Sequence, residues 1–358
     1  MPSLKEIKGR INSISSTLAI TSAMKMVAAA KLQKAQMAIQ NMLPYERRLH
    51  SMLIDLMGAM NISAAASEDG SVRGSGSAER GFDQSGDRLS LSNRHDLAGM
   101  DGAYSLMAQR EVRKVAIVAF ASNSSLCGAF NSNVIREATA VINEYRASGL
   151  GDADITVYSV GRKMAEAMKK LGFPSPADFT KMSDSPSYDA ASALAQELLD
   201  GFVSGRFDKV DLVYNHYKST SSQPTTRQTY LPLSLADATA DLQAGKIADS
   251  ASESDTNRGA EPVGAPVVRQ GSPTTEDLIV EPSKEALIAT LLPKVIRLRV
   301  FTTLLDSTAA EQAARTVAMQ LATDNGNDLL QELTLEYNKG RQQKITSEIL
   351  DLVGGSMQ

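Results

Sequence analysis

The stretch that decides the fold is residues 4–40, LKEIKGRINSISSTLAITSAMKMVAAAKLQKAQMAIQ, in which core-type positions recur at alternating spacings of three and four. The same spacing continues to Met60 and predicts one helix of about 55 residues, or about 80 Å. A helix of this length needs a partner along its apolar stripe. The predicted stripe comprises Leu4, Ile7, Ile11, Ile14, Leu18, Thr21, Lys25, Ala28, Leu32, Ala35, Ile39, Met42, Glu46, Leu49, Leu53, Leu56 and Met60.

A second long helix is predicted from Ser283, a suitable N-cap residue, to Val353, with Gly354 and Gly355 as its stop. Its own ladder is apolar in the first half, whereas Ala, Thr and Gln occupy core positions in the second half. Small side chains let two helices approach closely but bury little area. A helix pair held together only by this seam would be marginally stable, so an enclosing partner is implied.

Between the two helices, strand patterns alternate with helix patterns, which favours a small α/β domain with a partly parallel sheet and helices on both faces. The last two strands are expected to pair as an antiparallel hairpin. The expected strands are 112–122, 154–161, 208–219 and 225–234, and the expected helices are 130–147, 162–172 and 187–202.

Two segments rich in Gly, Ser and charge, 63–105 and 238–274, carry no packed-core pattern and are predicted to be flexible insertions. The predicted organisation is therefore an N-terminal coiled-coil helix (1–62), the first insertion, an α/β domain (106–237), the second insertion, and a C-terminal coiled-coil helix (275–358). The fold class is α/β with an antiparallel two-helix coiled coil and a Rossmann-like domain.

Composition narrows the function classes. The net charge of −4 gives no field that would attract nucleic acid, and Cys127 is the single cysteine, which favours a reducing compartment. We expect neither a signal peptide nor a membrane span, since no run of about 18 apolar residues occurs. The exposed face of the first helix is basic, either a solvated helix face or a surface complementary to an acidic protein.

The sequence lacks a recognisable catalytic constellation. No phosphate-binding G-x-x-x-x-G-K-[ST] motif occurs, and His50, His95 and His216 are too scattered to predict a triad or a zinc site. Cys127, in the loop SNSSLCGAFN, could be a nucleophile, but a buried small residue in a strand-to-helix turn is the favoured interpretation. Anion binding by that loop is the lesser alternative to tight packing. We therefore expect no catalytic residue, no cofactor and no metal.

Three motifs carry a family resemblance: AITSAMKMVAAAKLQKAQ, SLCGAFN, and AAEQAARTVAMQLATDNGNDLLQELTLEYNKGRQQKITSEILDLVGG. Together they resemble the gamma subunit of F-type ATP synthase, over both terminal helices and much of the α/β domain. The resemblance implies a non-catalytic central shaft, surrounded by three alpha and three beta subunits, whose α/β domain rests with the epsilon subunit on the c-ring. Proton flow would turn this shaft and drive the beta subunits through their conformational cycle.

The resemblance also implies contact residues. Met24 and Lys25 correspond to the position that meets an acidic lever of a beta subunit, and Arg315 to a position that supports energy coupling. Arg341, Gln342 and Thr346 match a segment that bonds a beta-subunit catch loop. Met357 and Gln358 would lie in the upper bearing of the hexamer.

Gly340 departs from the family pattern, since a glycine there replaces a better helix former and is expected to cost about 1 kcal/mol in an exposed helix interior. The second insertion lies where chloroplast members carry a redox cysteine pair, and it holds no cysteine. We hypothesise that it modulates rotation or docking. The expected location is the cytoplasmic side of a bacterial inner membrane. Two alternatives are a homodimeric coiled-coil scaffold or signalling protein with a Rossmann-like domain and, less favoured, a nucleotide-dependent enzyme.

Overall fold

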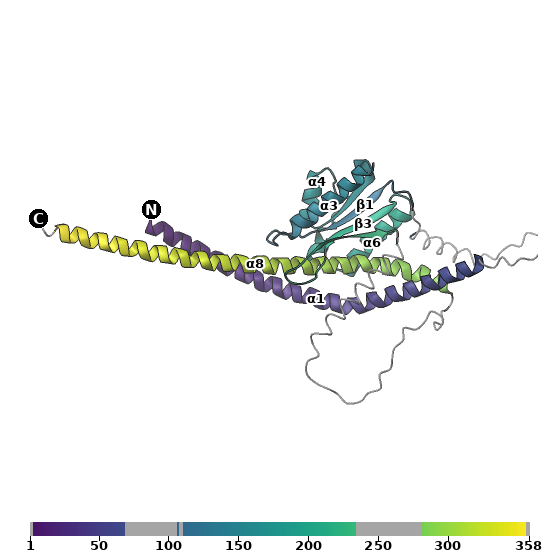
Figure 1. The fold of residues 1–358 in the computed structure, drawn as a ribbon, viewed down its shortest axis with the longest axis horizontal. Helices are drawn as coiled ribbons and strands as arrows, with labels where there is room; N and C mark the ends of the chain where they lie inside the picture. The colour runs from purple at the N-terminus through teal and green to yellow at the C-terminus, as the bar shows by residue number, and fades with distance from the viewer. Residues whose placement is uncertain (1–2, 69–105, 107–109, 234–280, 282, 356–358) are drawn as a thin grey trace, which may run out of the picture.

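The protein consists of two long antiparallel helices and an α/β domain that lies against one half of their length (Figure 1). The structure is a computed structural model and describes residues 3–68, 106, 110–233, 281 and 283–355. Helix α1 spans Leu4–Glu68 and helix α8 spans Lys284–Gly355. With 72 residues, α8 is about 108 Å long at 1.5 Å per residue. The predicted antiparallel coiled coil is confirmed.

Helix α1 continues through Glu68, so the predicted boundary at residue 62 is too early. The additional segment, SAAASE, contains three alanines, and alanine is the strongest helix former even where no apolar stripe continues. Helix α1 is bowed (Figure 1), and it contains Pro44, which removes one helical hydrogen-bond donor. The rest of the predicted first insertion, and all of the second, lie outside the described residues.

Helix α8 begins where the sequence predicted. Its N-cap is Ser283, whose Oγ accepts a hydrogen bond from the backbone N–H of Ala286 at 3.1 Å. The helix runs through Gly354 and Gly355, past the predicted end at Val353. The predicted domain boundary at residue 275 lies outside the described residues.

The α/β domain is built on a four-stranded sheet of order β2-β1-β3-β4. Strand β1 pairs in parallel with β2 and β3, whereas β3 and β4 are antiparallel, as the hairpin prediction required. The strands are β1 (Val115–Phe120), β2 (Ile155–Val160), β3 (Lys209–Asn215) and β4 (Thr225–Leu231).

Helices cover both faces of the sheet. Helices α3 (Phe130–Ala147) and α4 (Arg162–Lys170) pack on one face, against alternate residues of β1 such as Ile117. On the other face, α6 (Tyr188–Val203) and α8 pack against the intervening residues, together with a shorter helix, α5 (Thr180–Asp184). Helix α8 is therefore both a partner of α1 in the coiled coil and a layer of the α/β domain. The sequence pattern did not predict this double role.

The seam between α1 and α8 keeps one register from Leu4 to Ala35. Thr323 donates to Thr21 through their hydroxyls at 3.1 Å, and Leu32 and Ala35 pack with Ala309 and Ala313. Farther along, Leu18 faces Gly326 and Leu4 faces Gly340.

Both glycines lie under a leucine of the opposite helix. A Cβ atom at Gly326 would lie 2.6 Å from Leu18 Cδ2, and one at Gly340 would lie 3.2 Å from Leu4 Cδ2. Gly340 is thus half-buried in the seam, whereas the sequence suggested an exposed helix interior. Each glycine opens space for a leucine that points across the seam.

Candidate functional site

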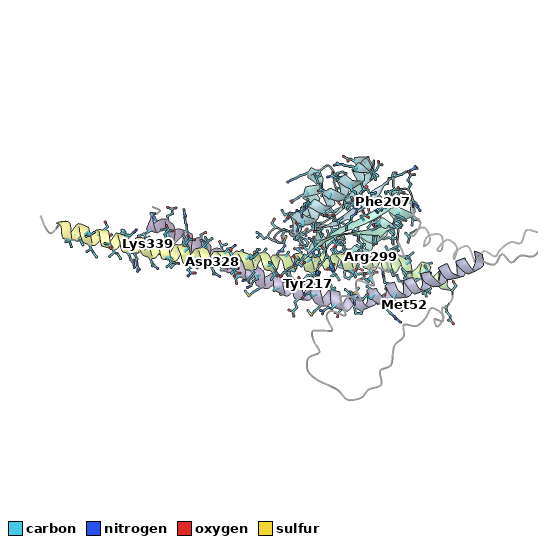
Figure 2. All side chains as sticks on the ribbon, in the orientation of Figure 1. Met52, Phe207, Tyr217, Arg299, Asp328 and Lys339 are labelled. Carbon is cyan, nitrogen blue, oxygen red and sulfur yellow. The ribbon has the colours of Figure 1, made fainter. Side chains whose placement is uncertain are left out.

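The coiled coil of α1 and α8, called the shaft from here on, extends beyond the α/β domain at one end (Figure 1), and side chains project from both helices there (Figure 2). Many of the exposed side chains in this half are large and apolar. Soluble proteins that act alone rarely expose so many apolar side chains in one region, and such regions mark interaction surfaces. The exposed residues of this half are Ile20, Met24, Met26 and Val27 on α1, and Leu321, Leu329, Leu335, Ile345, Ile349, Leu350, Leu352 and Val353 on α8.

Met24 and Lys25 lie side by side in this region. Met24 is exposed, whereas Lys25 is half-buried and donates from Nζ to Gln320 Oε1 of α8 at 2.8 Å. The amide of Gln320 in turn donates to both carboxylate oxygens of Asp324, at 2.8 and 3.0 Å. An ammonium has three N–H donors, so the bond to Gln320 leaves capacity for an acidic partner. The sequence did not indicate Gln320, because its partner lies on the other helix.

Arg315 lies in a different environment, largely enclosed. Its Nη2 donates to Glu311 Oε1 at 2.7 Å, one helical turn away, and the two side chains are only 14% and 8% exposed. Burial raises the pKa of Glu311 to about 7, although the Arg315 and Lys31 cations oppose that rise. Gln312 donates to the same carboxylate oxygen at 3.3 Å. Glu311 was not among the predicted site residues, although the spacing of four between Glu311 and Arg315 in AAEQAAR could have indicated this pair.

Arg341, Gln342 and Thr346 lie on the last part of α8, and all three are exposed. The register of the seam places Gly340 opposite Leu4, the first residue of α1, and the last part of α8 extends past the beginning of α1 (Figure 1). The hydroxyl of Thr346 donates to the backbone oxygen of Gln342 at 2.9 Å within the helix. The predicted bearing residues Met357 and Gln358 lie outside the described residues.

The structure separates the predicted contact residues into two groups. Gln342 follows Gln320, the partner of Lys25, by 22 residues in one helix, which is about 33 Å. Arg315 lies near the Lys25 level, and Arg341, Gln342 and Thr346 lie near the end of the shaft. The residues do not form one pocket; they mark two levels of one long surface.

The loop between β1 and α3 packs against the shaft. Cys127 is 1% exposed and clusters with Phe130 and Ala310. Ser122 bonds within the loop, through Oγ to the Ser124 carbonyl at 2.6 Å. The favoured interpretation of this loop as a packing element agrees with this geometry.

No helix among the described residues is long and apolar enough to cross a membrane. Within the same part of the chain, His, Cys, Asp and Glu side chains form no group of three or more that could hold a metal ion.

Comparison with known proteins identifies the family. A protein family described as "ATP synthase" matches residues 3–357 of this chain. An ATP synthase gamma chain of Phocaeicola vulgatus is 46% identical over 357 residues, which cover 100% of both chains. The chain belongs to the ATP synthase gamma-chain family. The gamma chain of Bacteroides thetaiotaomicron is 45% identical over 358 residues, again covering 100% of both chains.

A solved structure has the same fold. It is a chain of the Euglena gracilis mitochondrial ATP synthase, described as OSCP/F1/c-ring in rotational state 3, with 19% identity and a TM-score of 0.52. The match covers 99% of this chain and 93% of that chain. The predicted fold class and the prediction of an ATP synthase gamma subunit are both confirmed.

Proposed function

We propose that this chain is the non-catalytic rotor shaft of a proton-translocating F-type ATP synthase on the cytoplasmic side of a bacterial inner membrane. One copy would occupy the axis of three alpha and three beta subunits, and its α/β domain would rest on the c-ring beside an epsilon subunit. The bacterial gamma chains that match the whole length of this chain support the compartment and the partners.

The observation that carries the proposal is the uncovered half of the shaft. A helix pair with so many exposed apolar side chains requires an enclosing sleeve. A single α/β domain lies on one side of the helix pair, so the molecule is asymmetric about its long axis. Rotation of so asymmetric a body inside a ring of subunits would present a different face to each subunit in turn. The ring can then change state without any chemistry on the shaft itself.

Contacts with beta subunits are proposed at the two levels described above. Met24 and Lys25, with Arg315 nearby, would act at the level nearer the α/β domain, where basic charge attracts an acidic lever. Arg341, Gln342 and Thr346 would act on the part of α8 that extends beyond α1, and Met357 and Gln358 in the upper bearing. Exposed side chains on a single helix can reach a surrounding subunit without rearrangement of the shaft.

The assembly is tested by native mass spectrometry of the complex purified through a tag on this chain. The expected result is one copy with three alpha and three beta chains. A self-sufficient homodimer would refute the rotor proposal and favour the scaffold alternative. Pairing of α1 with α8 within one chain already satisfies the apolar stripe that a homodimer would have covered.

The contact at Met24 is tested by the Met24→Lys variant, assayed in inverted membrane vesicles for ATP hydrolysis and ATP-driven proton pumping. A second cation beside Lys25 should hold the acidic lever in one rotor position, because each of three positions must bind with similar strength for smooth rotation. We expect fewer protons pumped per ATP. The matched control is Met26→Lys, which adds the same charge two residues away on a different helix face. Equal pumping per ATP in Met24→Lys and the parent would contradict the contact.

A further inference from the structure

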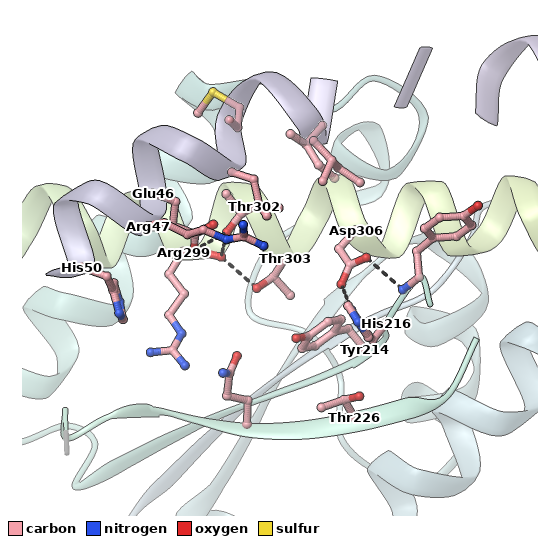
Figure 3. A pocket seen from close by; sticks show the side chains of 16 residues that line it. Glu46, Arg47, His50, Tyr214, His216, Thr226, Arg299, Thr302, Thr303 and Asp306 are labelled. Atoms are coloured by element: carbon pink, nitrogen blue, oxygen red, sulfur yellow. Dashed lines mark hydrogen bonds and ion pairs between the residues drawn. The ribbon is translucent and has the colours of Figure 1, made fainter. Parts of the chain in front are cut away.

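Two kinds of contact join the α/β domain to the shaft. On one side the contact is apolar and close, through Phe130 and Cys127 against Ala310 and through α6 against α8. On another side a cavity of about 550 Å³ lies between α1, α8 and the strands β3 and β4 (Figure 3). The domain is therefore not packed solidly on the shaft at this side, and discrete polar contacts bridge the gap.

Asp306 of α8 makes the central bridge. Its Oδ2 lies 2.6 Å from His216 Nδ1, and its Oδ1 accepts from the backbone N–H of Tyr217 at 2.9 Å (Figure 3). Both partners belong to the segment that follows β3. The side chain of Asp306 is 18% exposed and that of His216 is 51% exposed, so the carboxylate is partly shielded from solvent whereas the imidazole is not.

The same segment also reaches the other shaft helix. Gln36 of α1 donates from Nε2 to the hydroxyl of Tyr217 at 2.6 Å. Two consecutive residues, His216 and Tyr217, thus connect the sheet to both α1 and α8. Tyr217 also packs beside the small-residue seam formed by Leu32, Ala35, Ala309 and Ala313.

Resting on the rotor function proposed above, we propose that Asp306 is the positioning residue that transmits torque between the α/β domain and the shaft. If the c-ring turns the α/β domain, the domain pushes sideways on the shaft. Apolar packing is non-directional, whereas hydrogen bonds lose strength steeply when their geometry changes. A carboxylate that binds both a side chain and a backbone N–H resists displacement along two directions.

The charge state of His216 changes the strength of its hydrogen bond to Asp306. The hydrogen bond to Asp306 raises the pKa of His216, against opposition from burial and from the Lys218 cation. The other charged or titratable groups around the cavity are Glu46, Arg47 and His50 on α1, Arg299 on α8, and Tyr214 and Tyr217 of the domain. Because protonation of His216 strengthens this hydrogen bond, the contact between the domain and the shaft is strongest below the ordinary histidine pKa. It weakens as the pH rises through the raised pKa of His216.

The test uses three variants in the complete complex: Asp306→Ala, the isosteric Asp306→Asn, and Asp306→Glu as the conservative rescue. We expect Asp306→Ala to retain ATP hydrolysis, since the shaft surface beyond the domain is unchanged, but to pump fewer protons per ATP. In Asp306→Asn the uncharged amide should remove the dependence of pumping per ATP on pH that we expect in the parent. Asp306→Glu should restore part of the parental ratio.

Hydrogen exchange gives an independent readout. In Asp306→Ala the Tyr217 amide should exchange about fivefold faster, while amides within β1 keep their parental rates. Parental pumping per ATP in Asp306→Ala, or parental Tyr217 exchange, would overturn the inference. If Asp306→Ala fails to assemble, Asp306→Asn and His216→Phe, which removes the Nδ1 partner of Asp306, carry the same test, and parental behaviour of both variants would refute it. If the parent complex pumps protons normally, the rotor proposal stands whatever result these variants give.

Discussion

The two seam glycines allow a matched test of how the shaft is packed. In a helix interior alanine is favoured over glycine by about 1 kcal/mol, unless the added methyl group meets a steric clash. At Gly340 a new Cβ would lie 3.2 Å from Leu4 Cδ2, which needs a shift of a few tenths of an ångström at the beginning of α1. The Gly340→Ala variant should therefore stabilise the chain, by about 0.5–1 kcal/mol.

Gly326→Ala should behave differently. Its Cβ would lie 2.6 Å from Leu18 Cδ2 and 3.1 Å from Leu18 Cγ, so the whole end of Leu18 must move. A displaced rotamer costs about 0.5–1.5 kcal/mol, and overpacking of a tight contact costs about 1–3 kcal/mol. These costs exceed the gain in helix propensity. We expect Gly326→Ala to be less stable than the parent by about 1 kcal/mol, and less stable than Gly340→Ala by about 1–2 kcal/mol.

The assay is equilibrium urea unfolding of the full chain, followed by circular dichroism at a helix wavelength. Leu18→Ala, alone and combined with Gly326→Ala, completes a double-mutant cycle. With Leu18 truncated the clash disappears, so Gly326→Ala should then stabilise the protein as Gly340→Ala does. Equal stabilisation by the two glycine variants in the parent, or the same effect of Gly326→Ala with and without Leu18, would refute this account of the seam.

Two further predictions concern the buried acid and the sheet. Because burial raises the pKa of Glu311 from 4.5 to about 7, the folded chain binds a proton in this window that the unfolded chain releases, so stability should fall as pH rises from 4.5 to 7. Glu311→Gln should lose that pH dependence, worth about 3 kcal/mol at most, in thermal unfolding measured across the window; an identical profile in parent and variant would contradict the buried carboxyl. Gly161→Ala should destabilise the chain by about 3 kcal/mol or more, because Gly161 has φ of +96° and an added Cβ would collide with the Ala121 carbonyl oxygen. Unchanged urea unfolding of that variant would show that the turn from β2 into α4 can relax.

The sequence by itself determined the long-range plan of this protein. Heptad spacing from Leu4 to Met60 requires a long helix with a partner, and a strand-helix alternation predicts the α/β domain, because both periodicities are local properties of the chain. The cap at Ser283 was predictable for the same reason. The family motifs also predicted which residues of the two long helices contact beta subunits.

Only the tertiary structure decided which residues meet across the two helices and across the domain junction. Local periodicity says which face of a helix is buried, but not what lies opposite, so Gln320 beside Lys25 and Gly326 beneath Leu18 could not be predicted. The double role of α8, as coiled-coil partner and as a layer of the α/β domain, follows from packing between segments far apart in sequence. Asp306, an ordinary acidic residue in the sequence, gains its significance only because folding places it opposite His216 and Tyr217, 90 and 89 residues away along the chain.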